Sequence, residues 1–218
     1  MKTIDKITIP TYTLGEEITN AIVHGLGALL GIAALVLCVI FSAIHGNAYT
    51  IVVSCIYGTT LVILYTTSCL YHSLKINKAK RIFRIIDHCS IYLLIAGTYT
   101  PYTLITLRGL FGWSTFGVIW GTAIIGIILN AINLDKFKKI SMFLYLAMGW
   151  VIIFTFKILA ENIEPTGLYL LLTGGIIYTI GAIFYGLGKT KKYMHSIFHI
   201  FVLTASILQF FSIFFYVI

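Results

Sequence analysis

Residues 19–43 read TNAIVHGLGALLGIAALVLCVIFSA, and this stretch contains no Asp, Glu, Lys or Arg. A helix that crosses a bilayer needs about 20 residues, because the hydrocarbon core is about 30 Å thick and each residue rises about 1.5 Å. The stretch therefore predicts a transmembrane helix. Residues 1–18 mix polar and apolar residues and do not resemble a cleavable signal peptide. We expect a short cytoplasmic segment there, followed by a helix that stays in the membrane.

Six more apolar runs follow, and the seven together account for most of the chain. The runs cover residues 19–43, 48–73, 84–107, 112–133, 140–160, 166–187 and 193–217. Their connections are short, so neighbouring helices should pack antiparallel. A β-barrel would instead show alternating segments of about 10 residues. We predict an all-α integral membrane protein in which residues 19–218 form a single seven-transmembrane-helix bundle.

The composition excludes soluble and disordered chains. Of the 218 residues, 59% are hydrophobic and only 10% are charged, and the mean hydropathy is +0.99. A soluble domain carries roughly 25% charged residues, and disorder requires low hydrophobicity. Two G-x-x-x-G patterns, which begin at Gly27 and Gly117, allow close helix approach, but glycine is common in membrane helices and generic packing is the favoured interpretation. Pro101 predicts a kink in the third helix.

The net charge of +8 has an explanation in orientation, because basic residues gather on the cytoplasmic side of membranes. Arg108 and Lys157 are the two bases expected outside. The other thirteen lie in the N-terminal segment and in the second, fourth and sixth connections: Lys2, Lys6, Lys75, Lys78, Lys80, Arg81, Arg84, Lys136, Lys138, Lys139, Lys189, Lys191 and Lys192. We predict a cytoplasmic N-terminus and an external C-terminus, the inverse of G-protein-coupled receptors. No nucleic-acid partner is needed to explain the basicity.

Few ionisable residues lie within the apolar runs, where they are energetically expensive. His72 ends the second run, Asp87 opens the third, and His195 and His199 open the seventh. His72, Asp87 and His195 each lie three residues from a base, about 4.5 Å along a helix. They should therefore match in depth near the cytoplasmic face. The spacing of four residues puts His195 and His199 on one helix face.

These residues suit a metal site. Three histidines and a water make a tetrahedral catalytic zinc site with one open position, and His72, His195 and His199 could supply the nitrogens. Asp87 has no basic partner in the apolar part of the bundle, so a water polarised by zinc would give it one. Ser68 lies one turn before His72 on the same helix face.

The remaining histidines are not assigned to the site. His88 should point about 100° away from Asp87, since a helix has 3.6 residues per turn. His24 opens the first run, and His45 is expected in a solvated outer loop. The His195–His199 pair lacks the glutamate of the H-E-x-x-H zinc proteases, which leaves Asp87 as the best-placed base.

The combination resembles the hemolysin III family of bacterial membrane proteins, which belongs with the progestin and adipoQ receptors and more distantly with alkaline ceramidases. The resemblance spans essentially the whole chain. The residues that carry it are Glu17-Ile18-Thr19-Asn20, His24-Gly25, Ser68-x-x-x-His72, Asp87-His88-Cys89-Ser90, Gly97, Pro101 and His195-x-x-x-His199. It implies an inverted seven-helix bundle with zinc near the cytoplasmic face, ligated by His72, His195 and His199. It also implies that Asp87 holds the zinc-bound water and that Ser68 is a neighbouring hydroxyl.

We therefore expect a zinc-dependent hydrolase of lipid amides, ceramide-like in kind, in the cytoplasmic membrane of a bacterium. Asp87 and Ser68 are the expected catalytic residues, and a membrane lipid is the expected partner. One alternative is a non-enzymatic regulator of membrane lipids or energetics with a structural zinc. Another is a hemolysin-type cytolytic pore former. A transporter is disfavoured, because the outer half of the bundle has almost no ionisable residue for a relay.

Overall fold

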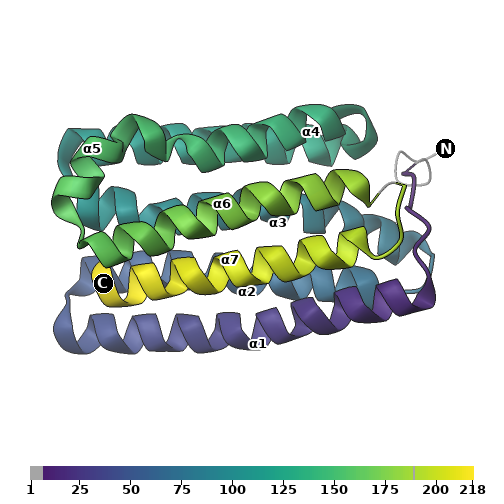
Figure 1. The fold of residues 1–218 in the computed structure, drawn as a ribbon, viewed down its shortest axis with the longest axis horizontal. Helices are drawn as coiled ribbons and strands as arrows, with labels where there is room; N and C mark the ends of the chain where they lie inside the picture. Colours follow the sequence, from purple (N-terminus) through teal and green to yellow (C-terminus); the bar gives the residue numbers. More distant parts are fainter. Residues whose placement is uncertain (1–6, 189) are drawn as a thin grey trace.

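The computed structural model describes residues 7–188 and 190–218, so the predicted loop bases Lys2, Lys6 and Lys189 lie outside the described residues. Within the described ranges the chain is helical and contains no strand. The helices lie side by side along one axis (Figure 1). In chain order they are α1 (Leu14–His45), α2 (Ala48–Ser73), α3 (Lys78–Pro101), the π-helix η2 (Tyr102–Leu107), α4 (Gly109–Trp150), α5 (Ile152–Asn162), α6 (Pro165–Leu187) and α7 (Met194–Tyr216).

One end of the bundle holds the start of α1, the end of α2 and the starts of α3 and α7, and we call it the proximal end. It lies on the right in Figure 1, and the C-terminus lies at the opposite, distal end. Helix α1 begins five residues before the predicted apolar run, because a capping box fixes its start. The Thr13 side chain accepts the N–H of Glu16, and the Glu16 carboxylate accepts the N–H of Thr13.

Helices α1 and α2 form a close antiparallel pair. Asn47 caps α2 by accepting N–H groups of Tyr49 and Thr50, so the bounds of α2 match the predicted run. A Cβ at Gly27 would overlap the Tyr65 ring, which shows that the first G-x-x-x-G pattern does mark a close approach. At Gly117 a Cβ would meet nothing within 4 Å. Gly117 is exposed, so the second pattern marks no close approach, in keeping with generic packing.

The long stretch of α4 and α5 folds back on itself. Asn133 has non-helical angles (φ −161°, ψ 91°). Beyond it, the Ser141 hydroxyl donates to Asn130 Oδ1 at 2.6 Å, and Asn130 Nδ2 donates to the Tyr145 hydroxyl at 3.2 Å. In a straight helix, residues 11 apart would be separated by about 16 Å. Residues 109–132 and 134–150 are therefore antiparallel arms. The first arm covers nearly all of the fourth predicted run, and the fifth is divided between the second arm and α5.

Pro101 ends α3 and is followed by the π-helical turns of η2. Arg108 (φ 51°) and Gly109 (φ 54°) then take left-handed conformations that reverse the chain into α4. Among the described residues, five helical stretches are long and apolar enough to cross a membrane: Leu14–His45, Ala48–Ser73, Gly109–Asn162, Pro165–Leu187 and Met194–Tyr216. A multi-pass membrane protein follows. The count of seven spans and their orientation stay predictions.

Candidate metal centre

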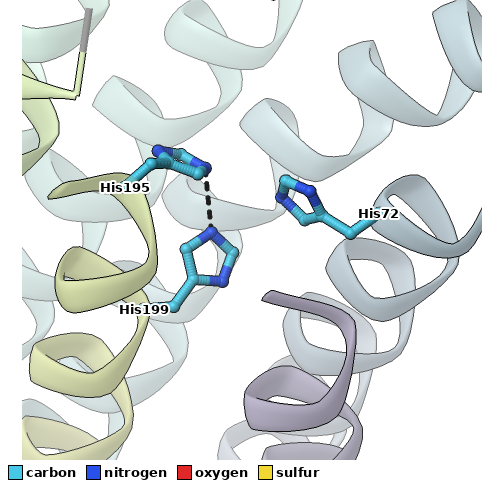
Figure 2. A group of neighbouring side chains, drawn as sticks. All are labelled: His72, His195 and His199. Atoms are coloured by element: carbon cyan, nitrogen blue, oxygen red, sulfur yellow. Dashed lines mark hydrogen bonds between the residues drawn. The ribbon is translucent and has the colours of Figure 1, made fainter. Parts of the chain in front are cut away.

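Three histidine rings from two helices converge near the proximal end of the bundle. His72 lies in the last turn of α2, while His195 and His199 lie in the first two turns of α7, and all three are buried. Figure 2 shows the rings pointing toward one another. One nitrogen from each lies within 4.8 Å of the others, and the Nε2 atoms of His195 and His199 are 2.9 Å apart. The fold therefore brings the three expected ligands together.

The geometry fits a tetrahedral metal ion. Zinc–nitrogen bonds of about 2.0 to 2.1 Å place two tetrahedral ligands about 3.3 Å apart, which falls within the spread of the three nitrogens. His72 Nε2 is buried and has no hydrogen-bond partner within the described residues, as a nitrogen kept for a metal requires. Imidazole donors suit zinc and also copper, iron or nickel. The group could hold such an ion.

The half-buried carboxylate of Glu17 fixes the orientation of His72. His72 Nδ1 lies 2.6 Å from Glu17 Oε2, and since a carboxylate can only accept, Nδ1 carries the proton. Lys80 Nζ donates to Glu17 Oε1 at 2.6 Å and to the Leu74 carbonyl at 3.0 Å. The proton on Nδ1 leaves Nε2 free to bind a metal, in the arrangement by which carboxylates orient metal-binding histidines elsewhere.

Glu17 belongs to one of the motifs that carry the family resemblance, but the sequence alone assigns it no role. The signal available was an acidic residue directly before a membrane-length apolar run. Lys80, one of the bases that the sequence places in the second connection, is only 2% exposed. The reason is the neighbouring Glu17 carboxylate, which repays the cost of burying an ammonium group.

The segment before α1 packs against two of the three histidines, His72 and His195, through Tyr12. The Tyr12 ring stacks on His195, with centroids 4.9 Å apart and an interplanar angle of 15°. The Thr8 N–H donates to Asp135 Oδ2 at 2.9 Å, which ties this segment to the turn between the arms of α4. Burial, aided by nearby Tyr185 and Glu17, raises the pKa of the Tyr12 phenol, so the ring stays neutral. No sequence signal pointed to Tyr12, because it lies in a short polar segment without periodicity.

Both predicted catalytic residues line the same cavity as His195 and His199. Ser68 is 1% exposed, and its hydroxyl has no hydrogen-bond partner among the described residues. Asp87 is half-buried, and its Oδ2 lies 3.5 Å from His88 Nδ1. The expectation that His88 points away from Asp87 was wrong. Its ring bends back along α3 to donate to the Arg84 carbonyl at 2.9 Å, so it lines the cavity as well.

His24, to which the sequence assigns no role, lies beside the three histidines in the fold. Its ring centroid lies 3.8 Å from that of His199, and its edge meets the Tyr65 ring at 5.1 Å. The residue is 3% exposed and lines the cavity. Hydropathy placed His24 only at the start of a span. The antiparallel pairing of α1 with α2 and the packing of α1 on α7 bring its ring to the histidines.

The cavity is long and largely apolar. Its volume is about 170 Å³, and its walls come mainly from α3, the second arm of α4, α6 and α7. Along α3 it extends from Asp87 to Tyr102, a rise of about 22 Å. A bilayer core of about 30 Å is formed by two acyl chains end to end, about 15 Å each, so the cavity is long enough to hold one acyl chain.

Comparison with known proteins adds the family. The model of the "Haemolysin-III related" family matches residues 12–210. The chain is 46% identical to Hemolysin-3 from Bacillus cereus, over 98% of this chain and 97% of that protein. It is 44% identical to a Hemolysin-3 homolog from Bacillus subtilis, over 94% of this chain and 96% of that protein. The human monocyte to macrophage differentiation factor is 27% identical over 92% of this chain and 84% of its own length.

Proposed function

Because this chain belongs to the haemolysin-III related family of membrane proteins and brings three buried imidazoles to one end of an apolar cavity, we propose that it is a zinc-dependent hydrolase of lipid amides. The observation that carries the proposal is that the histidine group and the apolar cavity adjoin each other. His195 and His199 belong both to the metal-binding group and to the cavity lining. An acyl chain in the cavity would thus hold its carbonyl beside the metal.

The side chains around this point supply the remaining groups. A bound zinc ion would polarise a carbonyl and lower the pKa of a coordinated water to about 7. Asp87 would accept a proton from the attacking water and return it to the nitrogen that leaves. Ser68 would donate to the carbonyl oxygen as negative charge develops on it. One C–O bond forms, the C–N bond breaks, and the products are a fatty acid and an amine.

We further propose that this site lies in the cytoplasmic leaflet of a bacterial cell membrane. The support is charge, because the bases of the connections between α2 and α3, between the arms of α4, and between α6 and α7 lie at the proximal end. Basic connections stay on the cytoplasmic side. The test adds a protease to one side of a sealed membrane and asks whether the N-terminal segment is cleaved. Cleavage only when the protease is on the cytoplasmic side would support this orientation. Cleavage from outside would contradict it.

The test of the reaction uses the full chain in lipid nanodiscs loaded with zinc. Zinc per chain and fatty acid released from a panel of long-chain amides are measured together. We expect wild type to bind one zinc and to release fatty acid. Asp87→Asn should keep the zinc and lose most of the release, while His199→Ala should lose both.

The matched control for that test is His45→Ala, which removes an exposed histidine near the distal end of α1 and should behave as wild type. Wild-type release no higher than that of His199→Ala would refute the hydrolase. If wild type binds zinc but releases no fatty acid, the site is a metal centre with a role other than amide hydrolysis.

That other role is the second candidate, that of a membrane regulator with a structural metal. The observation that favours it is the cover over the histidines, since Tyr12 stacks directly on His195. A structural zinc has four protein ligands, whereas a catalytic one keeps an open position. X-ray absorption spectroscopy of the zinc-loaded chain separates them. Three nitrogens and one oxygen support the hydrolase, and four protein ligands support the regulator.

A further inference from the structure

Contacts between α1 and α2 reveal a second layer of polar residues beside the metal centre. Asn20 Nδ2 lies 3.4 Å from His72 Nδ1, Gly27 faces the Tyr65 ring, and Gly31 faces Leu61. In these three pairs the residue number on α2 decreases by as much as the residue number on α1 increases, as in any regular antiparallel pair. This register places His24 opposite Ser68. The His24–Ser68 layer lies one turn further from the proximal end than the Asn20–His72 layer.

The polar atoms of this layer have no partners. Neither ring nitrogen of His24 nor the hydroxyl of Ser68 forms a hydrogen bond within the described part of the chain. His24 is 3% exposed and Ser68 is 1% exposed, and both line the cavity. Most buried polar groups in proteins are hydrogen-bonded, and one that is not needs an explanation. A ligand in the cavity provides it.

The chemistry of the two side chains says what kind of group they would hold. A neutral imidazole offers one donor and one acceptor, and a hydroxyl can donate and accept. The His24 ring packs against the His199 ring and lies nearly perpendicular to the Tyr65 ring, and these two contacts fix its orientation. An amide linkage presents a carbonyl acceptor beside an N–H donor. An ester presents the carbonyl but has no N–H.

We propose that His24 and Ser68 form a subsite that recognises the amide linkage of a long-chain N-acyl amine, and that His24 selects amides over esters. Ser68 donates to the carbonyl oxygen, and a ring nitrogen of His24 accepts the amide N–H. The acyl chain then runs along the cavity toward Tyr102. This inference rests on the proposed function and narrows its substrate class. A site built to bond an N–H rejects analogues that lack it.

The test compares two probes that differ in one atom, N-oleoylethanolamine and 2-hydroxyethyl oleate. Their binding is measured by the shift in thermal unfolding of the zinc-loaded full chain in detergent micelles, and the fraction of each probe recovered intact is recorded alongside. Wild type should bind the amide at least about tenfold more tightly than the ester, the worth of one hydrogen bond.

Two variants separate hydrogen bonding from packing. His24→Phe keeps a stacked ring and removes both nitrogens, and it should lose the preference for the amide. His24→Gln loses the ring and keeps an acceptor, and it should retain part of the preference. Zinc per chain should equal the wild-type value in both variants.

The results that would overturn the subsite differ from those that would overturn the hydrolase. Equal binding of the two probes by wild type, or an undiminished preference in His24→Phe, would overturn the subsite. Loss of zinc in both variants would assign His24 to the metal centre and would also overturn it. If wild type prefers the amide through His24 but leaves it intact, the subsite stands and the hydrolase fails.

Discussion

The two halves of the bundle handle buried polar groups in opposite ways. Near the distal end most are hydroxyls that bond one another, and the buried Tyr57 hydroxyl, which has no partner among the described residues, is an exception. Ser42 bonds Ser54 at 2.8 Å, and Tyr102 donates to Ser212, which donates to the Gly167 carbonyl at 2.7 Å. Such pairs join helices and leave nothing for a ligand.

The proximal half buries ionisable groups and leaves several of them unsatisfied. Ring nitrogens of His24, His72 and His199 and the Ser68 hydroxyl have no partner among the described residues. Tyr57 and Tyr92 also carry unpartnered hydroxyls outside this cluster. Polar burial without pairing costs stability, and its concentration at one end supports the proposed binding site there. Four predictions test the contrast.

The largest effect is expected from removing a ligand at the proximal end. His72→Ala should reduce zinc from one ion per chain to nearly none, because two imidazoles on one helix cannot hold the ion alone as tightly as three ligands. Metal analysis of the purified chain measures this, with circular dichroism to show that the helices remain. Full zinc occupancy in His72→Ala would rule out the proposed ligand set.

A smaller proximal effect should follow from Glu17→Gln. The carboxylate that fixes the protonated Nδ1 of His72 is lost, and loss of such partners lowers metal affinity by about 10- to 100-fold. Competition with a chelator measures the affinity. Glu161→Gln, at an exposed distal position, is the control.

Glu17→Gln also leaves the Lys80 ammonium buried without its partner, which lowers stability. The double variant Glu17→Gln/Lys80→Met separates the two effects. It should recover thermal stability while the zinc affinity remains weak. Recovery of both would mean that Glu17 acts through stability alone.

The junction between the halves is tested by Gly27→Ala. The added methyl would overlap the Tyr65 ring, which is buried and held by its bond to Ser206 at 2.7 Å. Overpacking of this kind costs about 1 to 3 kcal/mol. Denaturant unfolding of the zinc-loaded chain measures the cost. Gly117→Ala, where the methyl meets open space, should unfold as wild type does, and equal stability of the two variants would contradict the packing role.

The smallest effect is expected at the distal end. Ser42→Ala removes one interhelical hydrogen bond, worth about 0.6 kcal/mol on average within a membrane. Zinc content should not change. The double variant Ser42→Ala/Ser54→Ala should be no less stable than the single one, because it leaves no buried hydroxyl unpaired. A change in zinc content would show that the halves are not independent.

Much of the candidate site could be predicted because it depends on how far along its helix each residue lies. Apolar run lengths and flanking bases placed His72, Asp87 and His195 at one depth, and the helical period placed His195 and His199 on one face. The hairpin within the long α4–α5 stretch follows from two short apolar runs with basic residues between them. These inferences need only distance along the chain and the thickness of a bilayer.

The residues that were missed or misplaced depend on positions across the bundle. Glu17 reaches His72, His24 reaches His199, and Tyr12 reaches His195 through contacts between residues that lie at least 55 positions apart in the chain. The His88 side chain lies beside Asp87, with 3.5 Å between Nδ1 and Oδ2, a contact that helix periodicity alone does not predict. Hydropathy and charge specify the depth of a residue, because the bilayer varies only along its normal. The neighbours of that residue within the membrane plane depend on which helices pack together, so they come from the fold.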